Sequence, residues 1–244
     1  MKAIFKKEIN AFFANNIGFL VLGLYWIINI LFLWVVDSNY SILNTGNANL
    51  VPFFELSALV FIFIIPAVGM KSFSEEKKSG TLELLYTKPI SKLSLVMGKF
   101  WAIFCINCIA LLPSLIFILY LNNLIFDSES LDYSAIFGSY LGLLLLSSSY
   151  ISLTLLASSF TKNLILSFSL GVVFCLTAFY ALAGISHIDL LGSSVYALEY
   201  LSLSFHYKSL SRGVIDSRNI IYFLSFTVLF ISICVYQLQK KQEE

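Results

Sequence analysis

Charged residues are scarce in this sequence, and their scarcity excludes an ordinary soluble protein. Asp, Glu, Lys and Arg make up 12% of the 244 residues, whereas hydrophobic residues make up 59%. A typical soluble domain has about 25% charged residues, because water must solvate its surface. The mean hydropathy of +0.87 agrees with this shortage of charge. The composition therefore predicts an integral membrane protein, with lipid facing much of its surface.

Cysteine and histidine are also few, and their placement argues against a disulfide framework or a metal site. All four cysteines lie inside apolar runs: Cys105, Cys108, Cys175 and Cys234. Cys105-x-x-Cys108 has the spacing of a redox or zinc motif, but no His and no second cysteine pair lies nearby. We therefore expect the cysteines to pack as small hydrophobic side chains.

The residue patterns of catalysis are missing as well. The sequence contains no G-x-x-x-x-G-K-[ST] loop, so this chain lacks the backbone cradle and lysine that ATP binding needs. It also contains no paired catalytic carboxylates and no nucleophile–base pair. A net charge of +1 gives no indication of nucleic-acid binding. We expect neither catalysis nor a cofactor in this polypeptide, so any ATP-driven motion must come from another chain.

Long apolar runs are what the sequence does contain. Crossing a hydrocarbon core of about 30 Å takes about 20 helical residues. Six runs reach or approach that length: residues 17–36, 53–70, 96–121, 136–160, 164–185 and 220–238. Only Thr161, Lys162 and Asn163 separate the fourth and fifth runs, which predicts a tight helical hairpin. No signal-peptide cleavage site follows the first run, so we expect it to be retained as a span.

The basic residues predict the orientation of these spans. All but three of the fifteen Lys and Arg residues fall on one side of the predicted membrane, and the exceptions are Lys208, Arg212 and Arg218. The positive-inside rule makes the lysine-rich side cytoplasmic. Both termini are then cytoplasmic, which requires an even number of spans and agrees with six.

Few polar residues interrupt the runs. We expect Asn29 and Asn107 to form hydrogen bonds between helices. Glu55 lies at the outer end of the second run, where its carboxylate can reach water. Pro66 and Pro113 each remove a backbone hydrogen bond and are expected to kink their helices.

The first sixteen residues are too polar to cross the membrane. Ile4, Phe5, Ile9, Phe12 and Phe13 share one helical face, opposite Lys6, Lys7 and Asn10. This pattern predicts an amphipathic helix in the cytoplasmic interface, with its lysines toward lipid phosphates. A plain cytoplasmic anchor is the alternative. Residues 1–16 thus form one unit, and residues 17–244 form a six-span domain.

Residues 71–95 form the longest predicted cytoplasmic loop. Ser79-Gly80 breaks the chain, and a short helix is expected over residues 81–86, with Thr81 capping its start and Pro89 following its end. Leu82, Leu85 and Tyr86 then share an apolar face. A helix of about two turns is unstable alone in water, so this face needs a contact. A soluble partner is one candidate, and the membrane surface is the other.

Residues 186–219 form an outer segment of intermediate polarity. This segment is too polar to span and too apolar for a free loop, which predicts one or two short helices that enter the outer leaflet. His187 and His206 lie here. Two histidines alone do not make a metal site, so we expect packing or solvation for both.

The cytoplasmic loop and the outer segment together resemble the permease subunits of ABC-2 type transporters. That family carries a loop motif E-x-x-x-G-T-x-E-x-L-x-x-x-P, which stands here as Glu76 followed by Gly80, Thr81, Glu83, Leu85 and Pro89. The outer segment, with Phe205-His206 and then residues 211–216, is also typical of the family. In detail the chain looks like the gliding-motility ABC transporter permeases (GldF-like).

The resemblance implies an all-α integral membrane fold with a definite set of functional segments. It implies a dimer in a bacterial inner membrane, cytoplasmic ATPase subunits as partners, and a membrane-anchored accessory gliding protein. Residues 71–95 would carry a coupling helix that docks the ATPase: Gly80, Thr81, Leu82, Glu83, Leu85, Tyr86 and Pro89. Residues 186–219 would form a re-entrant outer gate: Phe205, His206, Arg212, Gly213 and Asp216. The N-terminal helix would flank the coupling helix.

Two other classes of function remain open at this stage. A membrane scaffold or assembly factor could use the same loop to dock a cytoplasmic protein that is not an ATPase. A membrane-embedded enzyme is disfavoured by the missing catalytic residues. Copurification of a phosphate-loop ATPase would separate the transporter subunit from the scaffold.

Overall fold

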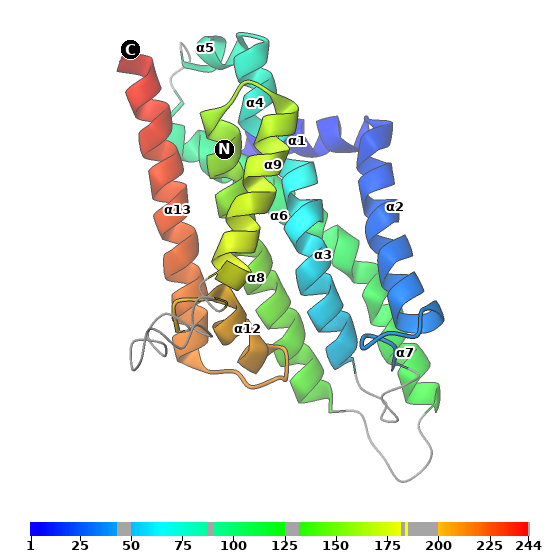
Figure 1. Cartoon of the computed structure of the whole chain (residues 1–244). Coiled ribbons are helices and arrows are strands. Elements are labelled where there is room, and N and C mark those ends of the chain that lie inside the picture. Colours follow the sequence, from blue (N-terminus) through cyan, green and yellow to red (C-terminus); the bar gives the residue numbers. More distant parts are fainter. Residues whose placement is uncertain (43–49, 87–89, 125–131, 182–183, 185–199, 244) are drawn as a thin grey trace.

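The computed structural model describes residues 1–42, 50–86, 90–124, 132–181, 184 and 200–243. Within these ranges the chain is helical, and Figure 1 shows the long helices running side by side as one bundle. The elements are α1 (Lys2–Phe13), α2 (Asn16–Ile30), η1 (Leu31–Val35), α3 (Val51–Gly69), α4 (Lys71–Lys78), α5 (Thr81–Tyr86), α6 (Lys92–Leu111), η3 (Leu112–Ser114), α7 (Leu115–Leu124), α8 (Tyr133–Phe160), α9 (Leu164–Leu176), η4 (Thr177–Ala181), α12 (Leu203–Leu210) and α13 (Ser217–Glu243).

Five helical stretches in the described part of the chain are long and apolar enough to cross a membrane. They are Asn16–Val35, Val51–Lys78, Lys92–Asn122, Tyr133–Phe160 and Ser217–Lys240. These confirm five of the predicted runs. A sixth stretch, Leu164–Tyr180, is apolar but shorter, and much of the chain that follows it lies outside the described residues. The six-span count therefore stays a prediction.

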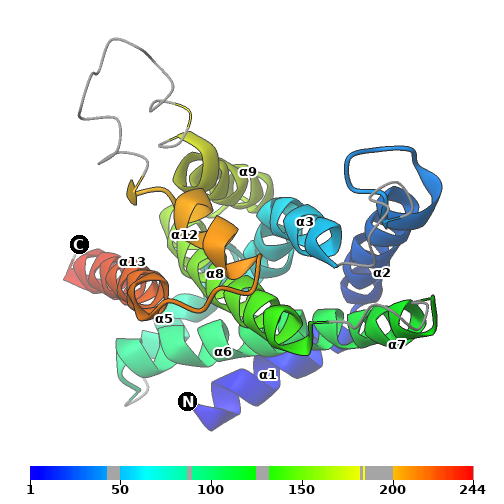
Figure 2. The ribbon, with the colours of Figure 1, turned by 90° about the horizontal axis from the view of Figure 1, so that it is seen from below.

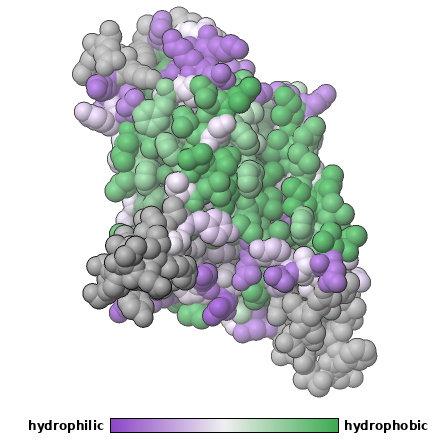
Figure 3. Space-filling view, viewed as in Figure 1, coloured by the Kyte–Doolittle hydropathy of each residue, from purple (hydrophilic) through white to green (hydrophobic). Residues whose placement is uncertain are grey.

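The surface shows the pattern expected of a membrane protein. On the face shown in Figure 3, apolar side chains form a band across the middle of the molecule, and polar side chains gather at its two ends. The exposed apolar residues include six from α2 and six from α13, and the spans that contain these two helices are the least buried of the five. Both termini lie at the end of the bundle that carries α1, α4 and α5 (Figure 1). Below, this end is called the coupling end and the other the outer end.

Helix α8 is the centre of the bundle, as Figure 2 shows from the outer end. It packs against α3, α6, α9, α12 and α13. Its buried serines bond back to carbonyls three or four residues earlier, for example Ser147 to Leu144, so they add no unsatisfied polar atoms. Ser148 also reaches Thr227 of α13 at 3.1 Å. Small residues let neighbouring helices approach closely without a hydrophobic driving force between them.

The hairpin predicted between the fourth and fifth runs is confirmed. α8 ends at Phe160 and α9 begins at Leu164, and the Asn163 side chain caps α9 by accepting a 2.9 Å hydrogen bond from the Ile165 amide. The two prolines lie in different surroundings. Pro113 lies in the 3-10 turn η3, which separates α6 from α7, so it does interrupt its span. Pro66 lies within α3, which continues through it.

Two polar predictions inside the spans also have different outcomes. Asn29 of α2 accepts a 3.2 Å hydrogen bond from Ser57 of α3 and donates one to the Tyr25 carbonyl, so it does link two helices. Glu55 is exposed near the outer end, as expected. The prediction for Asn107 is wrong, because its buried Nδ2 has no hydrogen-bond partner in the described structure.

Candidate functional site

The first part of the predicted cytoplasmic loop is a helix, which corrects the expectation for residues 71–78. α3 ends at Gly69, Met70 keeps a helical conformation, and α4 continues over Lys71–Lys78. Glu and Lys are good helix formers, and no breaker stands between Met70 and Lys78. The second span therefore projects beyond the apolar band and carries Glu76 into a buried position.

Glu76 and Lys99 form the centre of a buried charge cluster at the coupling end. The Lys99 ammonium, from α6, lies 3.0 Å from Glu76 Oε2 and 2.8 Å from Glu8 Oε1 of α1. It also donates a 2.5 Å hydrogen bond to the Ser72 carbonyl and lies over the Phe73 ring. The Lys99 side chain is only 1% exposed. Three helices thus meet on one lysine, whose charge two carboxylates neutralise.

Lys7 of α1 is the fourth charged residue of this cluster and lies on its exposed side. Its ammonium donates a 3.0 Å hydrogen bond to Glu76 Oε1, so α1 is attached to α4 directly as well as through Lys99. Burial lowers the pKa of Lys7, but the hydrogen bond to Glu76 and the nearby carboxylates more than offset this, and the net pKa is raised. Lys7 thus has a carboxylate partner in the same chain, its side chain is 61% exposed, and its contact with lipid phosphates stays a prediction.

The contacts of α1 explain this placement. Ile4 is buried against Gly98 of α6, where a methyl group added to the glycine would lie 3.1 Å from Ile4 Cβ. α1 thus packs along α6 and directs Glu8 toward Lys99. Two features of the sequence indicate this cluster. Lys99 lies inside the apolar run 96–121, where a lysine requires an acidic partner, and Glu8 is the only acid before Asp37.

α4 also contacts the helices on its far side. Lys77 donates a hydrogen bond to the Ser159 carbonyl in the last turn of α8, where a cation is favoured by the helix dipole. Ser167 of α9 donates a 3.0 Å hydrogen bond to the Met70 carbonyl at the junction of α3 and α4. α4 is therefore fastened to α1, α6, α8 and α9. A displacement of α4 would be transmitted to all four helices.

The short helix predicted over residues 81–86 is confirmed as α5. Gly80, at φ +72°, makes the turn between α4 and α5, a backbone conformation that glycine adopts without steric cost. Thr81 is the first helical residue of α5 rather than the residue before it. Its hydroxyl bonds back to Ser79 at 2.9 Å, so it holds α5 against the end of α4.

Of the three apolar residues in the predicted docking face, Leu82 is buried within this chain, and the docking role of the face stays a prediction. Leu82 is 6% exposed, and Leu85 packs partly against the core. Among the α5 side chains that the structure describes, Thr81 and Glu83 are exposed. Nothing is described for the Tyr86 side chain, and Pro89 lies outside the described residues.

At the outer end, the predicted gate residues lie around α12. Helix α12 packs against α8, α13 and η4, and Tyr207 donates a 2.7 Å hydrogen bond to the Phe54 carbonyl of α3. His206 is fully buried, with its two ring nitrogens 2.7 Å from Asn219 Oδ1 and 2.8 Å from the Tyr200 carbonyl. Packing is therefore confirmed for His206. His187 lies outside the described residues.

The remaining gate residues do not converge on one point. Phe205, Arg212 and Asp216 are exposed, and Asp216 caps α13 by accepting a 2.9 Å hydrogen bond from the Arg218 amide. Gly213 has φ +81° and lies so close to α8 that an added methyl group would be 2.2 Å from Ala135 Cα. α12 and Gly213 thus pack against α8. No group of three or more potential metal ligands occurs among the residues described.

These observations define the class of the protein as a multi-pass helical membrane protein with a charged coupling end. Comparison with protein families then identifies it further. The model of the ABC-2 family transporter proteins matches residues 2–242, so the chain belongs to the ABC-2 transporter family. Members of this family pair with ATPase subunits and form dimers. No curated protein is significantly similar to the sequence.

Proposed function

We propose that the chain is the permease subunit of an ATP-driven transporter, and that a separate ATPase acts on it at α5 and the end of α4. The observation that supports this most directly is the position of α4. It carries α5 at its end and is attached through Glu76 and Lys99 to α1 and α6, and through Lys77 to α8. Ser167 of α9 bonds to the Met70 carbonyl where α4 begins, so a force applied at α5 would reach four helices of the bundle.

The docking surface that we propose is the exposed polar side of α5, with Glu83 at its centre. Leu82 is buried and stabilises α5 from below, so it positions this surface without contacting the partner. In this proposal ATP binding and hydrolysis belong to the partner, and this chain catalyses nothing. The functional unit contains two copies of the permease and two ATPase subunits.

Affinity purification from cells tests this proposal. Tagged wild-type protein is expected to bring down a phosphate-loop ATPase, and Glu83→Lys, a charge reversal at an exposed position, is expected to lose it. Arg218→Glu is the matched control, because Arg218 is exposed at the outer end. If Glu83→Lys retains the ATPase, α5 is not part of the interface. Loss with both variants would place the contact elsewhere.

A scaffold that docks a cytoplasmic protein is the alternative function. The two differ in ATP hydrolysis by the purified complex. A transporter complex hydrolyses ATP, and its rate should fall when Glu76→Gln weakens the attachment of α4. A scaffold complex without ATPase activity would contradict the transporter proposal.

The orientation and the gliding-motility branch belong to this proposal as well. We propose that the protein lies in a bacterial inner membrane with both termini on the cytoplasmic side. Reporters fused near Asp127 and at the C-terminus should then report opposite compartments. The gliding branch, with its membrane-anchored accessory protein, rests on sequence resemblance alone. Deletion of the gene should abolish surface gliding without slowing growth, and unaltered gliding would exclude this branch.

A further inference from the structure

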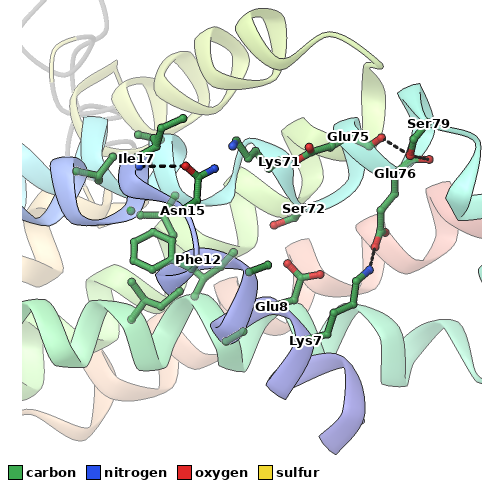
Figure 4. A pocket seen from close by; sticks show the side chains of 18 of the residues that line it. Lys7, Glu8, Phe12, Asn15, Ile17, Lys71, Ser72, Glu75, Glu76 and Ser79 are labelled. Atoms are coloured by element: carbon green, nitrogen blue, oxygen red, sulfur yellow. Dashed lines mark hydrogen bonds and ion pairs between the residues drawn. The ribbon is translucent and has the colours of Figure 1, made fainter.

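A cavity of about 350 Å³ opens at the coupling end between α1, α2, the α3–α4 junction and α6 (Figure 4). It lies where the polar end of the molecule meets the apolar band. Lys7, Glu8 and Phe12 of α1 line one wall, and Lys71, Ser72 and Glu75 of α4 line another. Its volume is at the lower end of the roughly 300–1,000 Å³ typical of ligand pockets.

The cavity lining changes from polar to apolar with depth in the bundle. Toward the coupling end it is formed by the charged side chains of α1 and α4. Toward the middle of the bundle it is formed by Val21 of α2, Ala67 and Val68 of α3, and Ile103 and Ile106 of α6. Such a cavity fits an amphipathic molecule with a compact charged end.

The charges in the cavity are mostly neutralised by one another, with two exceptions. Lys7, Glu8 and Glu76 belong to the ion pairs around Lys99. Lys71 and Glu75 also line the cavity, and neither has an ion-pair partner among the residues that the structure describes. These two side chains are one helical turn apart on α4, with Lys71 nearer the apolar band. They present one positive and one negative charge to the cavity.

We propose that this cavity binds the headgroup of a phospholipid that carries a phosphate and a primary ammonium group, as phosphatidylethanolamine does. The order of charges supports this assignment. From the membrane outward, such a lipid presents its acyl chains, then its phosphate and then its ammonium group. From the apolar band outward, α4 presents Lys71 and then Glu75. The phosphate pairs with Lys71, and the ammonium group pairs with Glu75.

Two other features of the lining distinguish this lipid from its common alternatives. The lining includes two lysines and three glutamates, and Lys99 pairs with two of those glutamates, so the charges at the cavity balance and a headgroup without net charge keeps them balanced. Among the lining residues described, Phe12 is the only aromatic one. A quaternary ammonium group is bound by several aromatic rings, so choline lipids are disfavoured. The pocket selects a zwitterionic headgroup with a primary amine.

The acyl chains have an apolar path out of the cavity along α2. Ile17 lines the cavity and is 48% exposed, and Leu20 and Leu24 follow it on the exposed surface of α2. A lipid bound in this way would touch α1, α2 and α4 together. It would link the amphipathic helix to the helix that carries α5, independently of any ATPase.

Native mass spectrometry of the purified protein tests the proposal with phosphatidylethanolamine, phosphatidylglycerol and phosphatidylcholine as probes. Wild-type protein should retain phosphatidylethanolamine about tenfold more strongly than either other lipid. Lys71→Met should reduce retention of phosphatidylethanolamine and phosphatidylglycerol about tenfold. Glu75→Gln should reduce only the preference for phosphatidylethanolamine. Lys78→Met and Glu83→Gln are the controls, because these exposed residues do not line the cavity.

Several results would overturn the proposal. If the wild type retains the three lipids equally, the lipid binds elsewhere. The same follows if both cavity variants retain phosphatidylethanolamine as well as the wild type does. Displacement by inorganic phosphate or by free phosphoethanolamine at equal concentration would identify a soluble ligand instead. A dimer that covers the cavity and retains no lipid would assign the cavity to the second copy. The melting temperature of each variant in detergent shows that lost binding is not lost folding.

Discussion

Lys99 and Glu76 lie 3.0 Å apart, Nζ to Oε2, with side chains that are 1% and 10% exposed. They come from helices α6 and α4, and each has a second partner of opposite charge, Glu8 for Lys99 and Lys7 for Glu76. A buried charge is costly unless it is paired, so this arrangement holds four side chains in one geometry. The pair therefore fixes the position of α4 relative to α1 and α6.

Removing the central lysine should destabilise the protein strongly. Lys99→Met leaves the Glu8 and Glu76 carboxylates without their shared cation, and breaking a buried ion pair costs about 3–5 kcal/mol. Titration of unfolding with sodium dodecyl sulfate in mixed micelles measures the loss. Lys6→Met is the matched control on exposed surface, with an expected change below about 0.5 kcal/mol. The double variant Lys99→Met, Glu76→Gln should recover part of the loss, and strict additivity would contradict direct coupling.

The attachment of α1 through Lys7 should weaken at high pH. The pKa of Lys7 is raised above 10.5 in the folded protein, despite the lowering effect of burial, because Glu76 and other carboxylates stabilise its charge. A raised lysine pKa contributes stability that is fully present below the unfolded value and is lost as pH rises through the folded value. The Lys7 side chain is 61% exposed, so the contribution is about 1 kcal/mol or less.

Unfolding of the wild type and Lys7→Met, compared at pH 8 and pH 11.5, measures this contribution. Wild type should be the more stable at pH 8, and the difference should shrink at pH 11.5. Because other lysines titrate over the same range, the difference between the two proteins is the informative quantity. A difference that does not change with pH would show that Lys7 acts through packing alone.

Two glycines with positive φ should respond differently to alanine. Gly80→Ala adds only backbone strain, about 1–2 kcal/mol, because nothing lies within 4 Å of the added methyl group. Gly213→Ala adds the same strain and also an overlap with Ala135 of α8. Such overpacking costs about 1–3 kcal/mol more. Melting temperatures in detergent should therefore fall in the order wild type, Gly80→Ala, Gly213→Ala. Equal effects would mean that the outer segment is loosely packed on α8.

Two buried tyrosines form a second matched pair. Tyr207→Phe removes the hydrogen bond from α12 to the Phe54 carbonyl and should cost about 0.5–1.5 kcal/mol. Tyr150→Phe removes a buried hydroxyl that has no hydrogen-bond partner in the described structure, so it should be neutral or stabilising. The free energies of unfolding of the two variants, measured under identical conditions, test this prediction. Equal losses would imply that Tyr150 bonds to a group outside the described residues.

Much of the fold follows from hydropathy and from local breakers. Five spans, the hairpin at Asn163 and the short helix α5 were all predictable, because apolar run length, helix capping and glycine act within a few residues. The packing of His206 and the link between Asn29 and Ser57 also agreed with simple expectations for polar groups in lipid.

The sequence by itself determined that this is a membrane protein, where most of its spans lie and which loop contains α5. Only the tertiary structure decided which helices α4 contacts, that Lys7 and Lys99 meet Glu76, and that Leu82 faces inward. Hydropathy depends on the transfer free energy of each residue by itself, so membrane spans can be predicted from the sequence alone. Ion pairing depends on residues 69 and 91 positions apart in sequence, and helix packing alone brings them together.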